Sequence, residues 1–156
     1  DLKGNMVVRV ELHRPVARII RNNGPDGYIA EDGTIMPVSD KFTARVILVS
    51  GTYTSQLLQM YNIKESHDGK NLMDMIYAIR RDDFLRAQAA QLDIDGKVNI
   101  SIYPQIGGQV IEFGKPENID VKFRKLKVFY KDILPQMGWN RYRKVNIAYE
   151  GQIVAE

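Results

Sequence analysis

Three turns that end in an acidic residue followed by glycine most constrain what this chain can fold into. Glu31-Asp32-Gly33, Asp95-Gly96 and Glu150-Gly151 each separate two short runs rich in β-branched and aromatic residues. Glycine after aspartate readily adopts the positive φ values that tight hairpin turns need. The sequence therefore predicts three hairpins, and hence a sheet that is largely antiparallel.

The runs around these turns predict the strands. Alternating or β-branched patterns place strands at residues 6–12, 16–20, 28–30, 34–36, 44–49, 84–94, 98–102, 109–113, 143–149 and 152–155. The stretch 84–94 is ambiguous, because Ala87, Ala89 and Ala90 also favour a helix. We interpret it as a strand, since the turn at Asp95-Gly96 needs a partner strand before it.

Three helices are expected between the strands. Their candidate N-caps are Thr54 or Ser55, Asn71, and Asn118 or Asp120, and the third helix is expected over about 121–134. Helical spacing gives apolar faces of Leu57, Leu58 and Tyr61, of Leu72, Met75, Ile76 and Ile79, and of Phe123, Leu126, Phe129, Tyr130 and Ile133. The predicted fold class is α+β, a mostly antiparallel β-sheet with helices packed on one face.

Composition narrows the class of protein. A chain of 156 residues with 44% hydrophobic and 26% charged residues is typical of one globular domain. A net charge of +3 is too small to indicate a nucleic-acid partner, and the absence of cysteine excludes disulfides and thiolate chemistry. No apolar run is long enough to span a bilayer. Because the chain begins at Asp1, we expect a soluble piece of a longer protein.

No catalytic, metal-binding or cofactor-binding group of residues is expected. His13 and His67 stand apart, without any local motif around either. Gly107-Gly108 lacks the further glycine of a dinucleotide-binding loop. The acidic residues of the loops are interpreted as solvated helix ends and turns: Asp82, Asp83, Asp93 and Asp95.

Two basic segments are interpreted as solvated surface. Arg141-Tyr142-Arg143-Lys144 precedes the last predicted hairpin, and no nucleic acid is expected to bind there. In the third helix the bases alternate with aromatic residues, so helical spacing sends the bases to water, where they could meet an acidic partner. These bases are Lys122, Arg124, Lys125, Lys127 and Lys131.

The order of these pieces resembles a known family. Residues 9–18 (RVELHRPVAR), 28–37 (YIAEDGTIMP) and 45–51 (RVILVSG) resemble the extracytoplasmic region of the bacterial cell-division family FtsQ/DivIB. The resemblance continues through the Asp95-Gly96 hairpin to Tyr149 and Gly151 near the end. It departs from the family at Asn146 and Ala148, where the family usually has Asp and Arg.

The resemblance implies a topology and a domain organisation. Family members are single-pass inner-membrane proteins with a small POTRA domain and a larger β domain on the periplasmic side. Residues 1–14 would be the end of a POTRA-like region leading into the sheet, and residues 15–156 the FtsQ-like β domain. The membrane anchor would lie before Asp1 in the whole protein.

The resemblance also implies a function. Such β domains are non-enzymatic scaffolds of the divisome, the assembly that forms the septum, and they bind FtsB-like and FtsL-like partners. By resemblance the contact surface is the last strands and the helix before them, which in this chain gives Tyr149, Gly151, Gln152, Ile153 and Val154. We expect binding by β-strand addition, with Tyr149 and Ile153 as apolar anchors.

Two alternatives belong to other classes of protein. A cell-wall glycosidase would need two carboxyl groups facing each other across a cleft, and its candidates are Asp82, Asp83, Asp93 and Asp95. A polyanion-binding domain would use Arg141, Arg143 and Lys144, and its affinity would fall steeply with salt.

Overall fold

A single mixed sheet organises the chain. The computed structural model describes residue 4 and residues 13–21, 26–38 and 45–156, and the strand expected at 6–12 lies outside these residues. Within this part, nine strands form one sheet in the order β3-β2-β1-β4-β5-β6-β7-β8-β9. The strands are β1 (Pro15–Ile19), β2 (Gly27–Ala30), β3 (Ile35–Pro37), β4 (Ile47–Ser50), β5 (Ala89–Ile94), β6 (Ile100–Pro104), β7 (Val110–Gly114), β8 (Lys144–Asn146) and β9 (Val154–Ala155).

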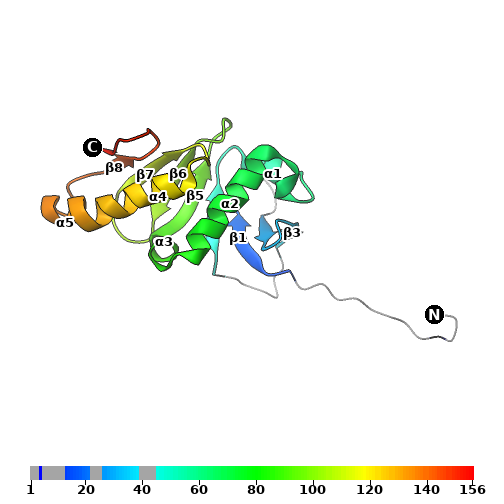
Figure 1. The fold of residues 1–156 in the computed structure, drawn as a ribbon. Helices are drawn as coiled ribbons and strands as arrows, with labels where there is room; N and C mark the ends of the chain where they lie inside the picture. Colours follow the sequence, from blue (N-terminus) through cyan, green and yellow to red (C-terminus); the bar gives the residue numbers. More distant parts are fainter. Residues whose placement is uncertain (1–3, 5–12, 22–25, 39–44) are drawn as a thin grey trace.

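The helices lie over one face of this sheet (Figure 1). They are α1 (Thr54–Leu57), the 3-10 turn η1 (Ile63–Glu65), α2 (His67–Arg81), α3 (Asp83–Gln88), α4 (Ile119–Val128), the π-helical turn η2 (Phe129–Ile133) and α5 (Leu134–Met137). Five of the eight neighbouring strand pairs are antiparallel and three are parallel. The predicted α+β class is therefore confirmed, as is the mostly antiparallel sheet.

One row of apolar side chains crosses seven strands in register. Each residue of the row pairs with the next across the sheet, and the row is Ile19, Val49, Leu92, Ile102, Ile111, Val145 and Ala155. All but Ala155 are buried, and Ala155 packs against the same core. Since neighbouring residues of a strand face opposite sides, the next row lies on the other face. It is polar up to β8: Ser50, Asp93, Ser101, Glu112, Asn146 and Val154.

The prediction of a strand over all of 84–94 is half wrong. Residues 83–88 form α3, and the strand begins only at Ala89. The helix starts because the Asp82 carboxylate accepts a hydrogen bond from the backbone N–H of Leu85 at 3.0 Å. This N-cap satisfies a donor that the first helical turn would otherwise leave unpaired.

Three other helix predictions also need correction. The N-cap of α2 is Ser66 rather than Asn71, and its hydroxyl accepts from the N–H of Gly69 at 2.9 Å. Asn118 stands at the start of α4 but makes no side-chain cap bond there. Tyr61 is exposed and belongs to no apolar helix face, because α1 ends at Leu57.

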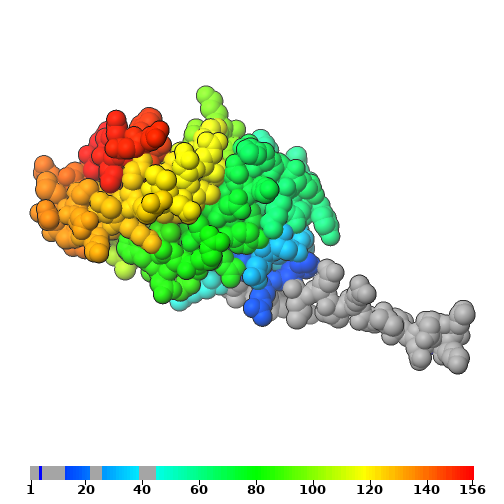
Figure 2. All heavy atoms as spheres, in the orientation of Figure 1, coloured from blue at the N-terminus to red at the C-terminus, as the bar shows by residue number. Residues whose placement is uncertain are grey.

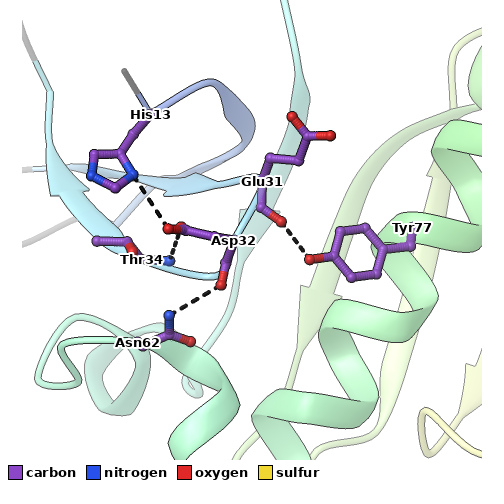
Figure 3. Close-up of polar contacts among 6 residues, drawn as sticks. All are labelled: His13, Glu31, Asp32, Thr34, Asn62 and Tyr77. Atoms are coloured by element: carbon purple, nitrogen blue, oxygen red, sulfur yellow. Dashed lines mark hydrogen bonds and ion pairs between the residues drawn. The ribbon is translucent and has the colours of Figure 1, made fainter. Parts of the chain in front are cut away.

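A polar network joins the β2–β3 hairpin to its surroundings (Figure 3). The Asp32 carboxylate accepts from the N–H of Thr34 at 3.0 Å and lies 3.4 Å from His13 Nδ1. The Asp32 carbonyl accepts from Asn62 Nδ2 at 3.1 Å. The hydrogen bonds to the carboxylate, with the charge of His13, lower the pKa of Asp32. Tyr77 of α2 donates its hydroxyl to the Glu31 carbonyl, so the hairpin is fixed to the helix layer.

Two tyrosine hydroxyls in this fold predict opposite effects on stability. The Tyr130 hydroxyl is buried without a hydrogen-bond partner in the described part of the chain, whereas that of Tyr77 is bonded to Glu31. We expect Tyr130→Phe to raise the free energy of unfolding by about 1 kcal/mol, and Tyr77→Phe to lower it by about 1 kcal/mol. Urea denaturation of both variants tests this, and a loss of stability in Tyr130→Phe would contradict it.

The ion pair between Asp82 and Lys127 of α4 predicts an acid-sensitive link between α3 and α4. Lys127 Nζ donates to Asp82, which lowers the pKa of that carboxyl below its ordinary value. The stabilisation is therefore complete above the unfolded pKa and is lost as pH falls through the folded pKa. Asp82→Asn should cost about 1 kcal/mol near neutral pH and almost nothing near about pH 2.

Urea denaturation at both pH values measures the Asp82 effect. Asp83→Asn is the matched control, because the Asp83 side chain is 94% exposed and, among the described residues, pairs with Arg86 alone, three positions along α3. An exposed pair of this kind should contribute little at either pH. An Asp82→Asn deficit that stays constant with pH would contradict the contribution of the ion pair with Lys127.

Candidate functional site: a free sheet edge beside a helix groove

In the part of the chain that the structure describes, the last strand, β9, lies at an end of the sheet and pairs with β8 alone. Glu156 donates its N–H to the Lys144 carbonyl at 2.9 Å and accepts from the Lys144 N–H at 3.2 Å. In an antiparallel ladder, alternate residues bond to the partner strand. Ala155 therefore directs its backbone N–H and C=O away from β8, toward the open edge.

The opposite edge of the sheet is partly covered by the chain itself. The N–H of Ile35 in β3 donates to the Tyr61 carbonyl at 2.9 Å. The N–H of Ile63 donates to the Gly33 carbonyl, also at 2.9 Å. The loop before η1 thus pairs with the start of β3, which makes the β9 edge the more accessible one for another strand.

A groove lies between α4 and the loop that leads into β9. Its helix wall consists of Val121, Arg124, Lys125 and Val128, which share a face at helical spacing. Gly151, Gln152 and Ile153 form the other wall, and the cavity measures about 340 Å³. In Figure 2 the end of the chain, in red, lies directly against the yellow spheres of α4. The valines are 46% and 45% exposed, so α4 presents apolar surface to solvent at this groove.

Lys125 holds the loop wall of the groove in place. Its Nζ donates to the Tyr149 carbonyl and to the Gln152 carbonyl, the latter at 3.2 Å. Between these residues Gly151 adopts φ +67°, a conformation that most side chains disfavour. The loop is thereby tied to α4 by its backbone rather than by its side chains.

The structure gathers some of the predicted contact residues and separates others. Gly151, Gln152 and Ile153 line the groove, and Val154 lies in β9 on the opposite face of the sheet from Ala155. Tyr149 is 61% exposed and lies outside any strand, so the expectation of a strand as far as 149 is wrong.

The shortened strand has a local cause. β8 ends at Asn146, whose side-chain oxygen accepts from the N–H of Ala148 at 2.9 Å. This bond turns the chain away from the strand direction. A Cβ at Gly114 would lie 2.9 Å from the Ala148 Cβ, so Ala148 sits closely against the end of β7. Asn146 and Ala148 thus shape the start of the loop.

The sequence alone did not identify the helix wall of the groove. Val121 and Val128 fell outside the expected apolar face of the third helix. Their spacing of seven residues, on the otherwise charged side of α4, was the available signal. Lys122 also differs from expectation, because it is buried over the Phe113 ring and donates to the Lys115 carbonyl at 2.8 Å. Burial lowers the pKa of Lys122.

The carboxylates considered for a glycosidase are occupied by structural bonds. Asp82 caps α3, and Asp83 pairs with Arg86. Asp93 accepts from the Ser50 hydroxyl at 2.9 Å. Asp95 accepts from the backbone N–H groups of the hairpin turn, at 2.8 Å and 2.9 Å, and these bonds lower its pKa. Each of the four carboxylates therefore has a structural partner among the described residues.

The remaining candidates are the basic residues considered for a polyanion site and any group of metal ligands. Arg141 and Arg143 are exposed, and Lys144 lies 3.9 Å from Glu112. In the described residues, no three His, Asp or Glu side chains lie close enough together to hold a metal ion. The same residues contain no helix that is long and apolar enough to cross a membrane.

Comparison with known proteins gives one family. The sequence model of the family described as "FtsQ/DivIB, C-terminal related" matches residues 14–156. No curated protein matches the chain.

The bonds of Lys125 predict a local rather than a global effect. Lys125→Met should expose the 149–153 loop, so its amides should exchange about tenfold faster while the free energy of unfolding falls by only about 1 kcal/mol. Hydrogen exchange followed by NMR measures both quantities. Arg124→Met is the control, since Arg124 lines the same groove and, within the described residues, donates to the Asp120 carbonyl of its own helix and to no residue of the loop. Equal acceleration in both variants would contradict the role of Lys125.

Proposed function

The chain belongs to the FtsQ/DivIB, C-terminal related family, and from this premise we propose that it is a divisome scaffold that binds its partners at the β9 edge. This family is a membrane-associated family of cell-division proteins that act as non-catalytic scaffolds in divisome complexes. A role in cell division follows for this chain. The partners, the contact residues and the absence of enzymatic activity form the proposal.

The single observation that carries the proposal is the open edge of β9. A partner segment in extended conformation would pair with the outward N–H and C=O of Ala155 and continue the ladder. The sheet would then gain a further strand without any rearrangement of β8 or β9. FtsB-like or FtsL-like proteins are the proposed source of this segment.

The side chains around the edge supply the specificity. On the helix side, the groove offers Ile153, Val121 and Val128 to apolar residues of the partner. Arg124 lies among them and is exposed, so a carboxylate of the partner can pair with it. Val154 on the other face of the sheet and Tyr149 in the exposed loop are available as rim contacts. The proposed partner segment is therefore apolar and acidic.

The proposed location follows from the same premise. The whole protein would be held in the inner membrane by a single helix, with these residues on the periplasmic side. In that arrangement residues 15–156 would be the β domain and residues 1–14 the end of a POTRA-like region.

The sharpest test removes one outward donor. Ala155→Pro deletes the N–H that faces the open edge, whereas the bonds between Lys144 and Glu156 remain. We expect it to weaken binding of an FtsB-like extracytoplasmic segment by about tenfold, and Ala155→Ser, which keeps the N–H, to have little effect. Calorimetric titration gives the affinities, and far-UV circular dichroism checks the fold.

A second variant tests the side chains. Tyr149→Ala combined with Ile153→Asp removes an exposed ring and places a charge in the groove. Affinity for the same segment should fall at least about tenfold, because an apolar contact and its packing are lost. Unchanged affinity in both this variant and Ala155→Pro, with the fold intact, would place the partner elsewhere on the molecule.

A further inference from the structure

A second groove, separate from the β9 edge, is bordered by arginines. β1, β4 and β5 run parallel, so their N-terminal ends lie side by side. Beside these strand ends lies a cavity of about 690 Å³, and Arg14, Arg45, Arg80 and Arg86 are among the residues that line it. Among the described residues, neither Asp nor Glu lines this cavity, and it shares no lining residue with the α4 groove.

The four arginines come from four different places in the chain. Arg14 precedes β1, Arg45 precedes β4, Arg80 lies in the last turn of α2, and Arg86 lies in α3. Figure 1 shows α3 close to the cyan chain that leads into β4, at the lower edge of the sheet. The fold thus brings Arg14, Arg45 and Arg80, which are far apart in the sequence, to one rim.

Three of these four guanidinium groups have no polar partner among the described residues. Arg86 donates to the Arg80 carbonyl at 2.9 Å and pairs with Asp83. Within the described residues, the guanidinium groups of Arg14, Arg45 and Arg80 take part in no hydrogen bond or ion pair. Arg80 and Arg86 lie in the last turns of α2 and α3, where the helix dipole stabilises a positive charge, and this explains why arginines stand there. It does not explain Arg14 and Arg45, which precede strands.

The floor of the groove is apolar. Val16, Ile79 and Ala89 are buried core residues that reach it from β1, α2 and β5. Val46 and Ile47 line it as well and are half-buried. An anion without apolar groups would pair with the rim and leave this surface against water, so a good ligand needs both kinds of group.

We propose that this groove binds an extended acidic segment of a partner protein, in which carboxylates alternate with small apolar side chains. Each guanidinium offers a planar pair of donors that matches a carboxylate. Alternation sends every second side chain to the opposite side of an extended chain. The carboxylates can then reach the arginine rim while the apolar side chains cover the floor. A flat bilayer surface can approach the rim but cannot fill a recessed floor.

The test uses the 156-residue chain and a synthetic peptide of alternating glutamate and valine. We expect saturable binding, with amide shifts in NMR spectra centred on Arg45, Ile47, Arg80 and Ala89. A peptide of glutamine and valine and one of glutamate alone should each bind about tenfold more weakly, since each lacks one of the two kinds of contact.

Matched variants locate the binding site. Replacing Arg14, Arg45 and Arg80 by glutamine should weaken binding of the glutamate–valine peptide about tenfold. Replacing the exposed Lys131, Arg141 and Arg143 by glutamine changes the net charge equally and should leave it unchanged. Val46→Asp, which adds a carboxylate at the floor, should abolish binding.

Three outcomes would overturn the proposal. The first is equal loss in the two triple variants, which would indicate non-specific attraction by net charge. The second is failure of the glutamate–valine peptide to bind. The third is binding of phosphatidylglycerol vesicles through the same arginines, without competition from the peptide, which would make the ligand a lipid surface. Ala155→Pro should leave the amide shifts at Arg45, Ile47, Arg80 and Ala89 unchanged, so this local readout does not depend on the β9 edge.

Discussion

The apolar row from Ile19 to Ala155 is the interaction on which the rest of the structure depends. Burial of one such side chain contributes about 1.5–3 kcal/mol, and the row joins seven strands across parallel and antiparallel pairs alike. A slip of one residue in β5 or β7 would place Asp93 or Glu112 in the core and expose its apolar neighbour. The register is therefore fixed from β1 as far as β9.

This register determines what the two ends of the sheet can do. Because the Ala155 side chain faces the core, Val154 lies on the other face of the sheet. In the same register, the backbone N–H and C=O of Ala155 point outward, away from β8. At the opposite end, the chain before η1 covers the start of β3. α4 follows the same rule, since Phe123 and Leu126 face the core and Val121 and Val128 remain outside. The open edge and its groove are thus consequences of how the core is packed.

The two candidate surfaces rely on different physics. The β9 edge offers backbone hydrogen bonds, which recognise any extended chain, and the α4 groove adds selectivity through shape. The arginine groove offers charge over an apolar floor, so its recognition depends on the ligand sequence. A scaffold with both could bind two different segments at once, because the grooves have no residue in common.

The sequence by itself determined the fold class, the hairpins and most of the core, because alternation and acidic-Gly turns are local signals. It also led to the family. It did not predict α3, whose start depends on the Asp82 cap, nor the burial of Lys122 against Phe113. Only the tertiary structure decided which edge stays open, where Val121 and Val128 meet the last loop, and that Arg14, Arg45 and Arg80 share one rim. Such features arise from contacts between residues far apart in the chain, which no local pattern records.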